Sequence, residues 1–355
     1  MTFGPRMLKT GIAVTLALYI SVWLHFSSPV IAAVAALFAM QPSIYRSWRY
    51  VLEQVQTNTL GAAIAMLAGT FFTNEPIAVG VVCVLVIMIC IKLKMDESIG
   101  LTLVTVVAVM EASGQWDFAL NRFLLSLIGI ASAFVINIAF LPPKPKAQFH
   151  EQARAVFTQL SLLLRTAVSD EMKEKIFREQ KQALYDRLTS LAAKYKLLEE
   201  EQKKIRRVKY REKRQLVVDK QMLVTLQKGY EVLEAVQEHF FQAERTPEMN
   251  KSYDRHLEKM IKFHEHVLLK FEDKLKPGSW DSAPAEEAND LFMKRAAESF
   301  NERKGGSLRL LIVASAIYDY GHQTARLSRM VDHVDEDDED DEEEKETAKV
   351  AKTEA

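Results

Sequence analysis

The chain has 355 residues, of which 48% are apolar and 26% charged, and 46 basic side chains nearly balance 47 acidic ones. Its two cysteines, Cys83 and Cys90, exclude a disulfide framework, because on one helix their backbones would lie about 10 Å apart. The net charge of −1 hides a division: residues 1–143 are strongly apolar, and ten consecutive acids occupy residues 335–344 of the charged remainder.

Six apolar stretches follow one another, at residues 10–24, 26–45, 54–74, 76–91, 98–110 and 123–143. Basic residues fall before the first, in every second gap and after the last: Arg6, Lys9, Arg46, Arg49, Lys92, Lys94, Lys144 and Lys146. Short basic loops stay cytoplasmic, so this alternation predicts a multi-pass protein of the cell membrane with six crossings and both termini in the cytoplasm. The stretch 98–110 is short for a crossing, and a re-entrant segment is the alternative there.

The apolar part repeats itself. A shift of 68 residues aligns residues 48–67 with 116–135 at five identical positions, including Gly61 with Gly129. Three crossings per repeat would give the two repeats opposite orientations, as in many secondary transporters. We therefore predict an inverted 3+3 repeat, with chance similarity between two apolar helices as the alternative. Small residues spaced by four, as in Gly61, Ala65 and Gly69, allow close helix packing within the unit or between copies of a homo-oligomer.

A more specific pattern follows the second stretch: Gln41-Pro42-Ser43, Trp48-Arg49, Gln54 and Thr59-Leu60-Gly61-Ala62-Ala63. It resembles the fusaric-acid-resistance superfamily, in which Pro-Ser, a basic loop and a Gly-Thr-x-x-Gly-like helix start follow the second crossing. Asn58 stands where that pattern usually has a glycine. Together with its helical C-terminal half, the chain is similar to the aromatic acid exporter family, in its short bacterial subgroup. The resemblance implies a transporter that exports small aromatic carboxylates.

Polar side chains within or beside the bilayer are costly and therefore candidates for function. The candidates for the substrate path are Arg122, Asn58, Gln41 and Asn137, and those for proton coupling are Glu111 and His25. The planar guanidinium of Arg122 suits a carboxylate, and burial can move the pKa of Glu111 or His25 toward neutrality. The alternatives are that Arg122 reaches the outer headgroups, that Glu111 belongs to a loop and that His25 caps the first crossing.

Prolines at 142, 143 and 145 end the apolar part, and beyond them apolar residues recur at helical spacing, as in Leu184, Leu188 and Leu191. This pattern predicts an all-α protein whose transmembrane domain (1–143) precedes a cytoplasmic antiparallel helical bundle (144–334), with one long helix through 170–217. The acidic run predicts a disordered tail at 335–355.

A basic run near residue 205 offers candidates for binding a membrane surface: Lys203, Lys204, Arg206, Arg207, Lys209 and Arg211. The acidic residues 199–201 just before it favour a plain solvated helix face, and the absence of interleaved aromatics argues against nucleic acid. The histidines His256, His264 and His266 lack the spacing of a metal motif, so neither a metal nor another cofactor is expected.

No phosphate-binding glycine loop, nucleophile elbow or kinase motif occurs, so we do not expect an enzyme. The favoured hypothesis is a proton-coupled secondary exporter of small aromatic or amphipathic carboxylic acids that works in the lipid bilayer. The alternative is a membrane-anchored scaffold or sensor whose helical bundle recruits partners.

Overall fold

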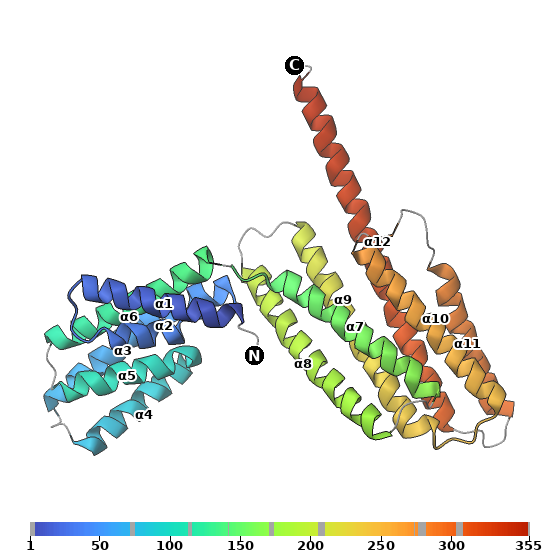
Figure 1. The fold of residues 1–355 in the computed structure, drawn as a ribbon, viewed down its shortest axis with the longest axis horizontal. Helices are drawn as coiled ribbons and strands as arrows, with labels where there is room; N and C mark the ends of the chain where they lie inside the picture. The colour runs from blue at the N-terminus through green and yellow to red at the C-terminus, as the bar shows by residue number, and fades with distance from the viewer. Residues whose placement is uncertain are drawn as a thin grey trace. The chain divides into compact units, whose positions relative to one another are not determined.

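The computed structural model describes residues 4–71, 75–112, 116–140, 142–169, 174–204, 210–272, 274–275, 282–302 and 308–353. Within these ranges the chain is helical throughout and contains no strand (Figure 1). It divides into two compact units, Met1–Lys144 and Pro145–Ala355, next to the boundary that we placed after residue 143.

Six α-helices make up the described part of the first unit. They are α1 (Pro5–Trp23), α2 (Val30–Phe38), α3 (Ile44–Phe71), α4 (Pro76–Lys92), α5 (Ile99–Glu111) and α6 (Trp116–Ala139), with a 3-10 turn, η1 (Asp96–Ser98), before α5. Pro5 and Pro76 occupy first-turn positions, where a missing N–H costs no hydrogen bond. Among the described helices, α6 is long and apolar enough to cross a membrane by itself, and α4 is a shorter apolar helix.

The second helix is much shorter than the apolar stretch 26–45 suggested. With nine residues, α2 is about 13 Å long, too short to cross a membrane alone. Pro42 disfavours the α conformation of Gln41 before it, and Ser43 then accepts a 3.1 Å hydrogen bond from the backbone N–H of Arg46 at the start of α3. The stretch 26–45 is therefore not one continuous helix, and Arg46 lies on α3 instead of in a loop.

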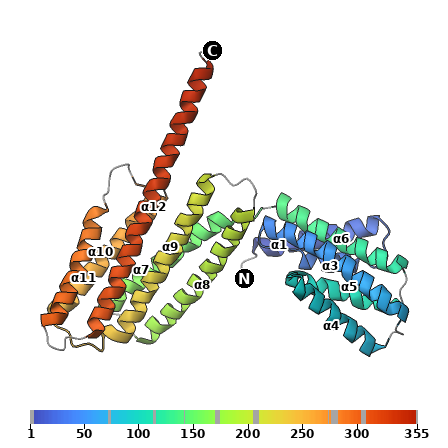
Figure 2. The same ribbon diagram turned by 180° about the vertical axis from the view of Figure 1, so that it is seen from behind.

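The helices of the first unit pack in two matching sets. α1 packs against α2 and α6, while α4 packs against α5 and α3, and α3 and α6 pack against each other (Figures 1 and 2). Exchanging α1, α2 and α3 for α4, α5 and α6 therefore maps one set of contacts onto the other. This is the packing that a three-helix repeat would produce.

The second unit is a helical bundle. Its helices are α7 (Pro145–Ser169), α8 (Glu174–Lys204), α9 (Tyr210–Ala235), α10 (Pro247–Phe271), α11 (Ala283–Glu302) and α12 (Leu308–Thr353), and a π turn (Val236–Phe240) extends α9. Four helices, α7, α9, α12 and α10, pack around a common core. α8 packs against α7 and α9, and α11 packs against α10 and α12 (Figure 2). α8 and α9 pack side by side as separate helices, so the prediction of one helix through 170–217 was wrong.

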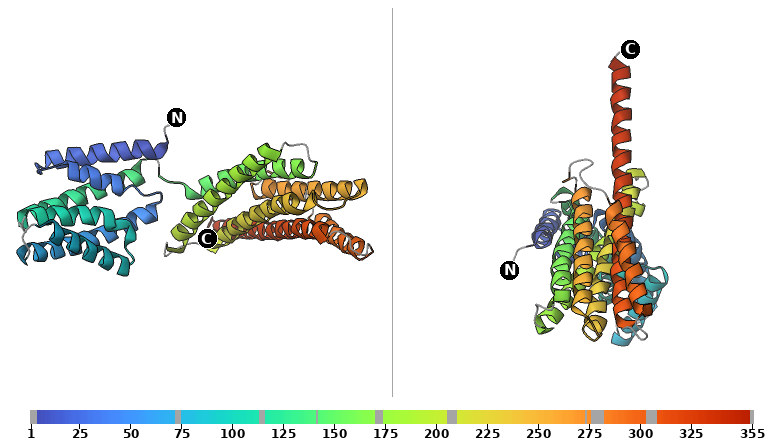
Figure 3. Two further views of the ribbon diagram at one scale, coloured as in Figure 1. Left: turned by 90° about the horizontal axis from the view of Figure 1, so that it is seen from below. Right: turned by 90° about the vertical axis from the view of Figure 1, so that its right-hand side faces the viewer.

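The last helix extends beyond the others. α12 continues to Thr353, and its final turns project past the ends of the neighbouring bundle helices (Figure 3). These turns include the acidic run, in which like charges four residues apart repel each other along a helix. The side chains from residue 334 onward lie outside the described residues, and the disordered tail at 335–355 stays a prediction.

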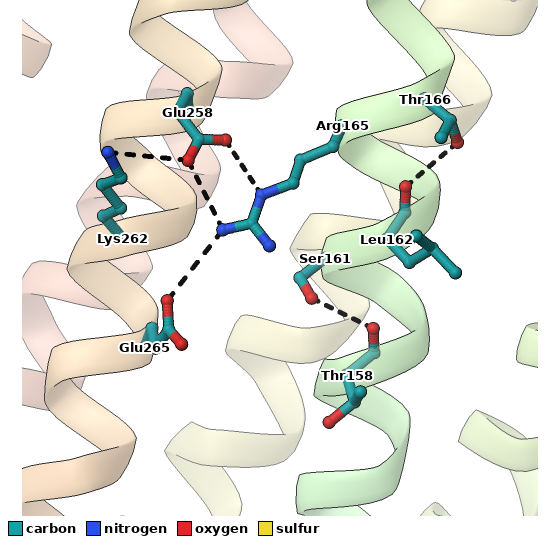
Figure 4. Close-up of polar contacts among 8 residues, drawn as sticks. All are labelled: Thr158, Ser161, Leu162, Arg165, Thr166, Glu258, Lys262 and Glu265. Atoms are coloured by element: carbon teal, nitrogen blue, oxygen red, sulfur yellow. Dashed lines mark hydrogen bonds and ion pairs between the residues drawn. The ribbon is translucent and has the colours of Figure 1, made fainter. Parts of the chain in front are cut away.

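Polar contacts connect the bundle helices across the core and its rim. At the rim, Arg165 of α7 donates from Nε to Glu258 of α10 at 2.9 Å and lies 3.9 Å from Glu265 (Figure 4). In the core, His264 Nδ1 lies 2.8 Å from the hydroxyl of Tyr320, and both side chains are fully buried. Burial lowers the pKa of His264 to about 3, because the charged imidazolium would lose its hydration.

Candidate functional site

The buried face of α3 is polar, although α3 lies in the most apolar part of the chain. Its buried polar side chains are Ser47, Glu53, Gln54, Thr57 and Asn58. Gln54 lies seven residues after Ser47, three before Thr57 and four before Asn58, and Glu53 is adjacent to Gln54, so they line one side of the helix. A helix with this composition would be expected to turn these groups to solvent. Here they face other helices of the unit.

The partner of this polar face is α5, which presents two threonines to it. Gln54 Nε2 donates to Thr102 Oγ1 at 3.3 Å, and the hydroxyl oxygens of Thr57 and Thr102 lie 2.9 Å apart. One turn further, Thr105 Oγ1 donates to Asn58 Oδ1 at 3.2 Å. All five side chains are buried. We call this group the α3–α5 polar seam.

In or beside the seam, two atoms are buried without a hydrogen-bond partner among the described residues: Gln54 Oε1 and the hydroxyl of Tyr50, one helical turn away. The orientation of the Gln54 amide follows from its neighbours. Thr102 Oγ1 lies 2.9 Å from both the Ser98 carbonyl oxygen and Thr57 Oγ1, and a hydroxyl that donates its one proton to either of them accepts from Gln54 Nε2. A buried polar atom left without a partner costs about 1–3 kcal/mol, so these two atoms create a demand for a water molecule or a polar ligand group.

Close backbone approach brings the helices of the unit together. A Cβ on Gly61 would lie 2.8 Å from Thr102 Cγ2, so the missing side chain of Gly61 allows α3 and α5 to approach each other closely. Gly129 of α6, which the shift of 68 residues aligns with Gly61, is packed against the backbone of α2. Both glycines therefore serve contacts inside the unit.

A second polar cluster lies where α1 begins and α6 ends. Lys9 Nζ donates to Asn137 Oδ1 at 3.2 Å, and Asn137 Nδ2 donates to Ser47 Oγ at 2.7 Å and to the carbonyl oxygen of Gln41 at 3.2 Å. Ser47 belongs to the polar face of α3, so this cluster adjoins one end of that face. Arg6 donates to the carbonyl oxygen of Met40 at 3.1 Å and so helps to cap the end of α2.

Comparison with known proteins gives this arrangement a family. Residues 1–140 match the model of a family described as aromatic acid exporter family member 1, and residues 99–354 match that of the fusaric acid resistance protein family. The UPF0421 protein YgaE of Bacillus subtilis (strain 168) is 34% identical over 280 residues, which cover 78% of this chain and 79% of YgaE. The chain belongs to the aromatic acid exporter and fusaric acid resistance family. Membership of this exporter family indicates a membrane transporter.

Two further relatives match this chain over a shorter length. The UPF0421 protein OB2406 of Oceanobacillus iheyensis is 29% identical over 160 residues, 44% of this chain and 46% of the relative. The UPF0421 protein BH2644 of Halalkalibacterium halodurans is 30% identical over 177 residues, 48% of this chain and 50% of the relative. The family resemblance inferred from the pattern around Gly61 is confirmed by these matches.

The structure places the predicted substrate-path and proton-coupling residues of this exporter-family chain in separate locations. Asn58 belongs to the seam, and Asn137 belongs to the Lys9 cluster, to which Gln41 contributes a backbone carbonyl. Arg122 donates from Nη2 to the carbonyl oxygen of Val104 at 3.3 Å at the other end of the unit.

The two residues predicted to take part in proton coupling also lie at that other end. Glu111 closes α5 and interacts electrostatically with Arg122. His25 is exposed in the turn after α1, with a positive φ of 58°. The structure therefore does not bring all six predicted residues to one place, and their roles stay predictions.

Several residues of these clusters were missed by sequence reasoning. Thr102 and Thr105 lie in an apolar stretch, and their hydroxyls, spaced by three residues, were the available signal. Lys9 was counted only as a charge that orients the chain. Among the described residues, no group of histidine, cysteine, aspartate and glutamate could hold a metal ion.

Binding of a membrane surface by the basic run near residue 205 stays a prediction. Its candidate residues are Lys203, Lys204, Arg206, Arg207, Lys209 and Arg211, and their side chains lie outside the described residues.

Proposed function

We propose that the chain is a multi-pass transporter of the cell membrane that exports small aromatic or amphipathic carboxylic acids and is driven by a proton gradient. Family membership supplies the class of function, and the name of the matching family supplies the substrate class. The observation that carries the proposal is the α3–α5 polar seam. Amides and hydroxyls that only hold membrane helices together satisfy one another. The seam leaves Gln54 Oε1 and the Tyr50 hydroxyl buried without partners among the described residues, as expected of groups that replace water around a polar solute.

The directions of the helices support alternating crossings. α3 and α5 run parallel, because the contacts from Gln54 to Thr102 and from Asn58 to Thr105 advance together along both helices. α2 and α6 likewise run parallel, since Asn121 contacts Ser27 near their starts and Gly129 packs on α2 further along. In both pairs, odd-numbered α3 and α5 and even-numbered α2 and α6, the helices thus point the same way. This is required if the chain changes direction after each of the six helices.

The charges of the unit support a cytoplasmic position for both termini. The cluster of Lys9 and Asn137 joins the start of α1 to the end of α6, and Arg6 joins that end to the end of α2. Arg49 and Glu97 interact near the start of α3, which brings the loop after α4 to the same end. The basic residues of the predicted loops therefore gather there, as expected of a cytoplasmic side.

The short helices fit a membrane-spanning unit only as parts of a bundle. α2 and α5, with nine and thirteen residues, are shorter than the hydrocarbon core, so we propose that flanking non-helical residues complete their passage. Such backbone is tolerated at membrane depth where protein covers it. In α2, Ala32, Ala35 and Ala36 are fully buried.

The experiment is uptake of radiolabelled 4-hydroxybenzoate into inverted membrane vesicles energised with a proton gradient. Thr102→Val removes the hydroxyl that joins Gln54 to Thr57 but keeps the shape of the side chain. We expect uptake to fall about tenfold, as for the loss of a buried hydrogen bond worth about 1.4 kcal/mol. Thr102→Ser keeps the hydroxyl, and Thr59→Val changes an exposed threonine of α3, so both should transport like wild type.

Two outcomes would count against the proposal. Correctly inserted wild-type protein that takes up no acid from a broad panel would refute the exporter. Uptake by Thr102→Val equal to that of Thr102→Ser would show that transport does not use the seam.

A further inference from the structure

Lys9 is one of two charged side chains that are buried among the described residues of the first unit, the other being Glu53. Glu53 is paired with Arg49, four residues before it on α3. Lys9 is only 6% exposed, and its single hydrogen-bond partner in the described part of the chain is the neutral amide oxygen of Asn137. Its ammonium therefore lies inside the unit without a carboxylate to balance it.

The neighbours of Lys9 hold Asn137 in one orientation. The carbonyl oxygen of Gln41 can only accept, so the Asn137 group that faces it at 3.2 Å must be the NH2 group. The same NH2 group donates to Ser47 Oγ at 2.7 Å, which leaves Oδ1 for Lys9. Asn137 thus holds the ammonium with one hydrogen bond, and two of the three N–H groups of Lys9 remain available for a ligand.

A buried ammonium without a counter-charge is unfavourable, and an anion that reaches it would recover much of the lost hydration. Lys9 lies one helical turn from the start of α1, close to the end where Arg6 adds a second positive charge. Ala13, one helical turn further along α1, belongs to an apolar cluster that also includes Met40 and Tyr50. A ligand with an anionic head and a small apolar body matches these surroundings.

We propose that Lys9, oriented by Asn137, contacts the carboxylate of a small amphipathic acid on the cytoplasmic side of the unit. The choice of a carboxylic acid as ligand rests on the proposed export function, whereas the need for an anion rests on the geometry alone. The proposal gives Lys9 the role that sequence analysis gave to Arg122. Arg122 instead donates to the carbonyl oxygen of Val104 and has Glu111 near it.

The test is equilibrium dialysis of radiolabelled benzoate against the full-length protein in detergent. Lys9→Gln should weaken benzoate binding about tenfold or more, as expected for the loss of a charge-assisted hydrogen bond. The matched control is Lys92→Gln, an exposed lysine at the end of α4, which should bind like wild type. Benzamide, which has the same ring without the charge, should bind weakly to all three proteins.

A second variant tests the same idea without removing the lysine. Asn137→Asp places a carboxylate where Oδ1 now faces Lys9, so it supplies the missing counter-charge from within the chain. This variant also loses the NH2 group that donates to Gln41 and Ser47, so Asn137→Ala, which loses the same donors without adding a charge, is its control. We expect Asn137→Asp to bind benzoate about tenfold or more weakly than Asn137→Ala, because its carboxylate already fills the site. A role for Lys9 in packing alone would leave the two variants with equal benzoate binding.

The outcomes separate this inference from the proposed function. Benzoate binding that requires Lys9, without any uptake into vesicles, would keep the anion site and refute the exporter. Uptake that Lys9→Gln leaves intact would keep the exporter and overturn the site. Wild-type protein that does not bind benzoate, or benzoate displaced by added phosphatidylglycerol, would also overturn it, the latter by giving the site to a lipid headgroup.

Discussion

Gly129→Ala tests the close contact between α2 and α6. A Cβ at this position would clash with the carbonyl oxygen of Ala32 and would lie 2.7 Å from Ala35 Cβ and 2.9 Å from the backbone nitrogen of Ala36. Two of these three atoms are backbone, so no side-chain rotation can relieve the clash, and the two helices must separate. Overpacking of this kind costs about 1–3 kcal/mol, and the upper end applies where backbone has to move.

A smaller effect opposes this loss. Alanine favours a helix over glycine by about 1 kcal/mol, so the net destabilisation should be about 2 kcal/mol. For a domain of this size, 2 kcal/mol lowers the Tm by about 4–8 °C. Gly80→Ala is the matched control, because nothing lies within 4 Å of a Cβ there, and it should be as stable as wild type or more so.

The cysteines supply an assay that reports on the first unit alone. Both lie on α4, and Cys90 is buried, so a thiol-reactive fluorophore labels it as the unit unfolds on heating. Size-exclusion chromatography of the same samples would show whether Gly129 also takes part in contacts between copies. A Tm for Gly129→Ala equal to or above that of Gly80→Ala would refute the α2–α6 contact. A change of oligomeric state at unchanged Tm would assign Gly129 to an interface between copies.

Two further predictions concern the bundle. Arg165→Gln should cost at most about 1 kcal/mol and show its effect mainly at low salt, since the contact of Arg165 with Glu258 is partly exposed and screened; an equal loss at 1 M salt would contradict this. Burial lowers the pKa of His256 to about 4 and that of His264 to about 3. Below about pH 6.5 the unfolded chain therefore binds more protons than the folded chain. Each histidine should then lower the free energy of unfolding by about 1.4 kcal/mol per pH unit as the pH falls toward those values. Unfolding monitored by circular dichroism should show a shallower pH slope for His264→Gln than for His266→Gln, whose histidine is half-buried and bonds the Lys262 carbonyl of its own helix. Equal slopes would contradict the assignment.

Helix positions could be predicted from the sequence where apolar runs were long and uninterrupted. α4 follows the stretch 76–91 closely, because nothing within that stretch favours another conformation. α6 begins seven residues before the stretch 123–143, at Trp116, and ends at Ala139, before Pro142 and Pro143. The stretch 26–45 was misjudged because hydropathy gave Pro42 too little weight against the apolar residues before it. The split between α8 and α9 was missed for a related reason, since a helical pattern of apolar residues does not show where the chain reverses.

The candidate site was harder to predict because it is defined by which polar side chains form hydrogen bonds with each other. Asn58 and Asn137 were recognised as costly polar residues in apolar surroundings, and both are buried and hydrogen-bonded. Nothing in the sequence pairs Asn58 with Thr105, because helix pairing depends on three-dimensional packing. Gly61 and Gly129 were found as small residues, but whether they faced other helices of the unit or a second copy was left open.

The cost of the polar seam bears on the choice between a transporter and a scaffold. An anchor could pack α3 and α5 through apolar side chains of the same volume, and replacing both partners of a buried hydrogen bond in that way is nearly neutral or stabilising. The chain instead places Gln54 and Thr102 between these helices and leaves Gln54 Oε1 and the Tyr50 hydroxyl buried without partners in the described structure. A half-satisfied buried network is worse for stability than an apolar core, so stability alone does not explain it. The energetic cost therefore favours a function that uses these groups, and passage of a polar solute between α3 and α5 is the use that fits an exporter family.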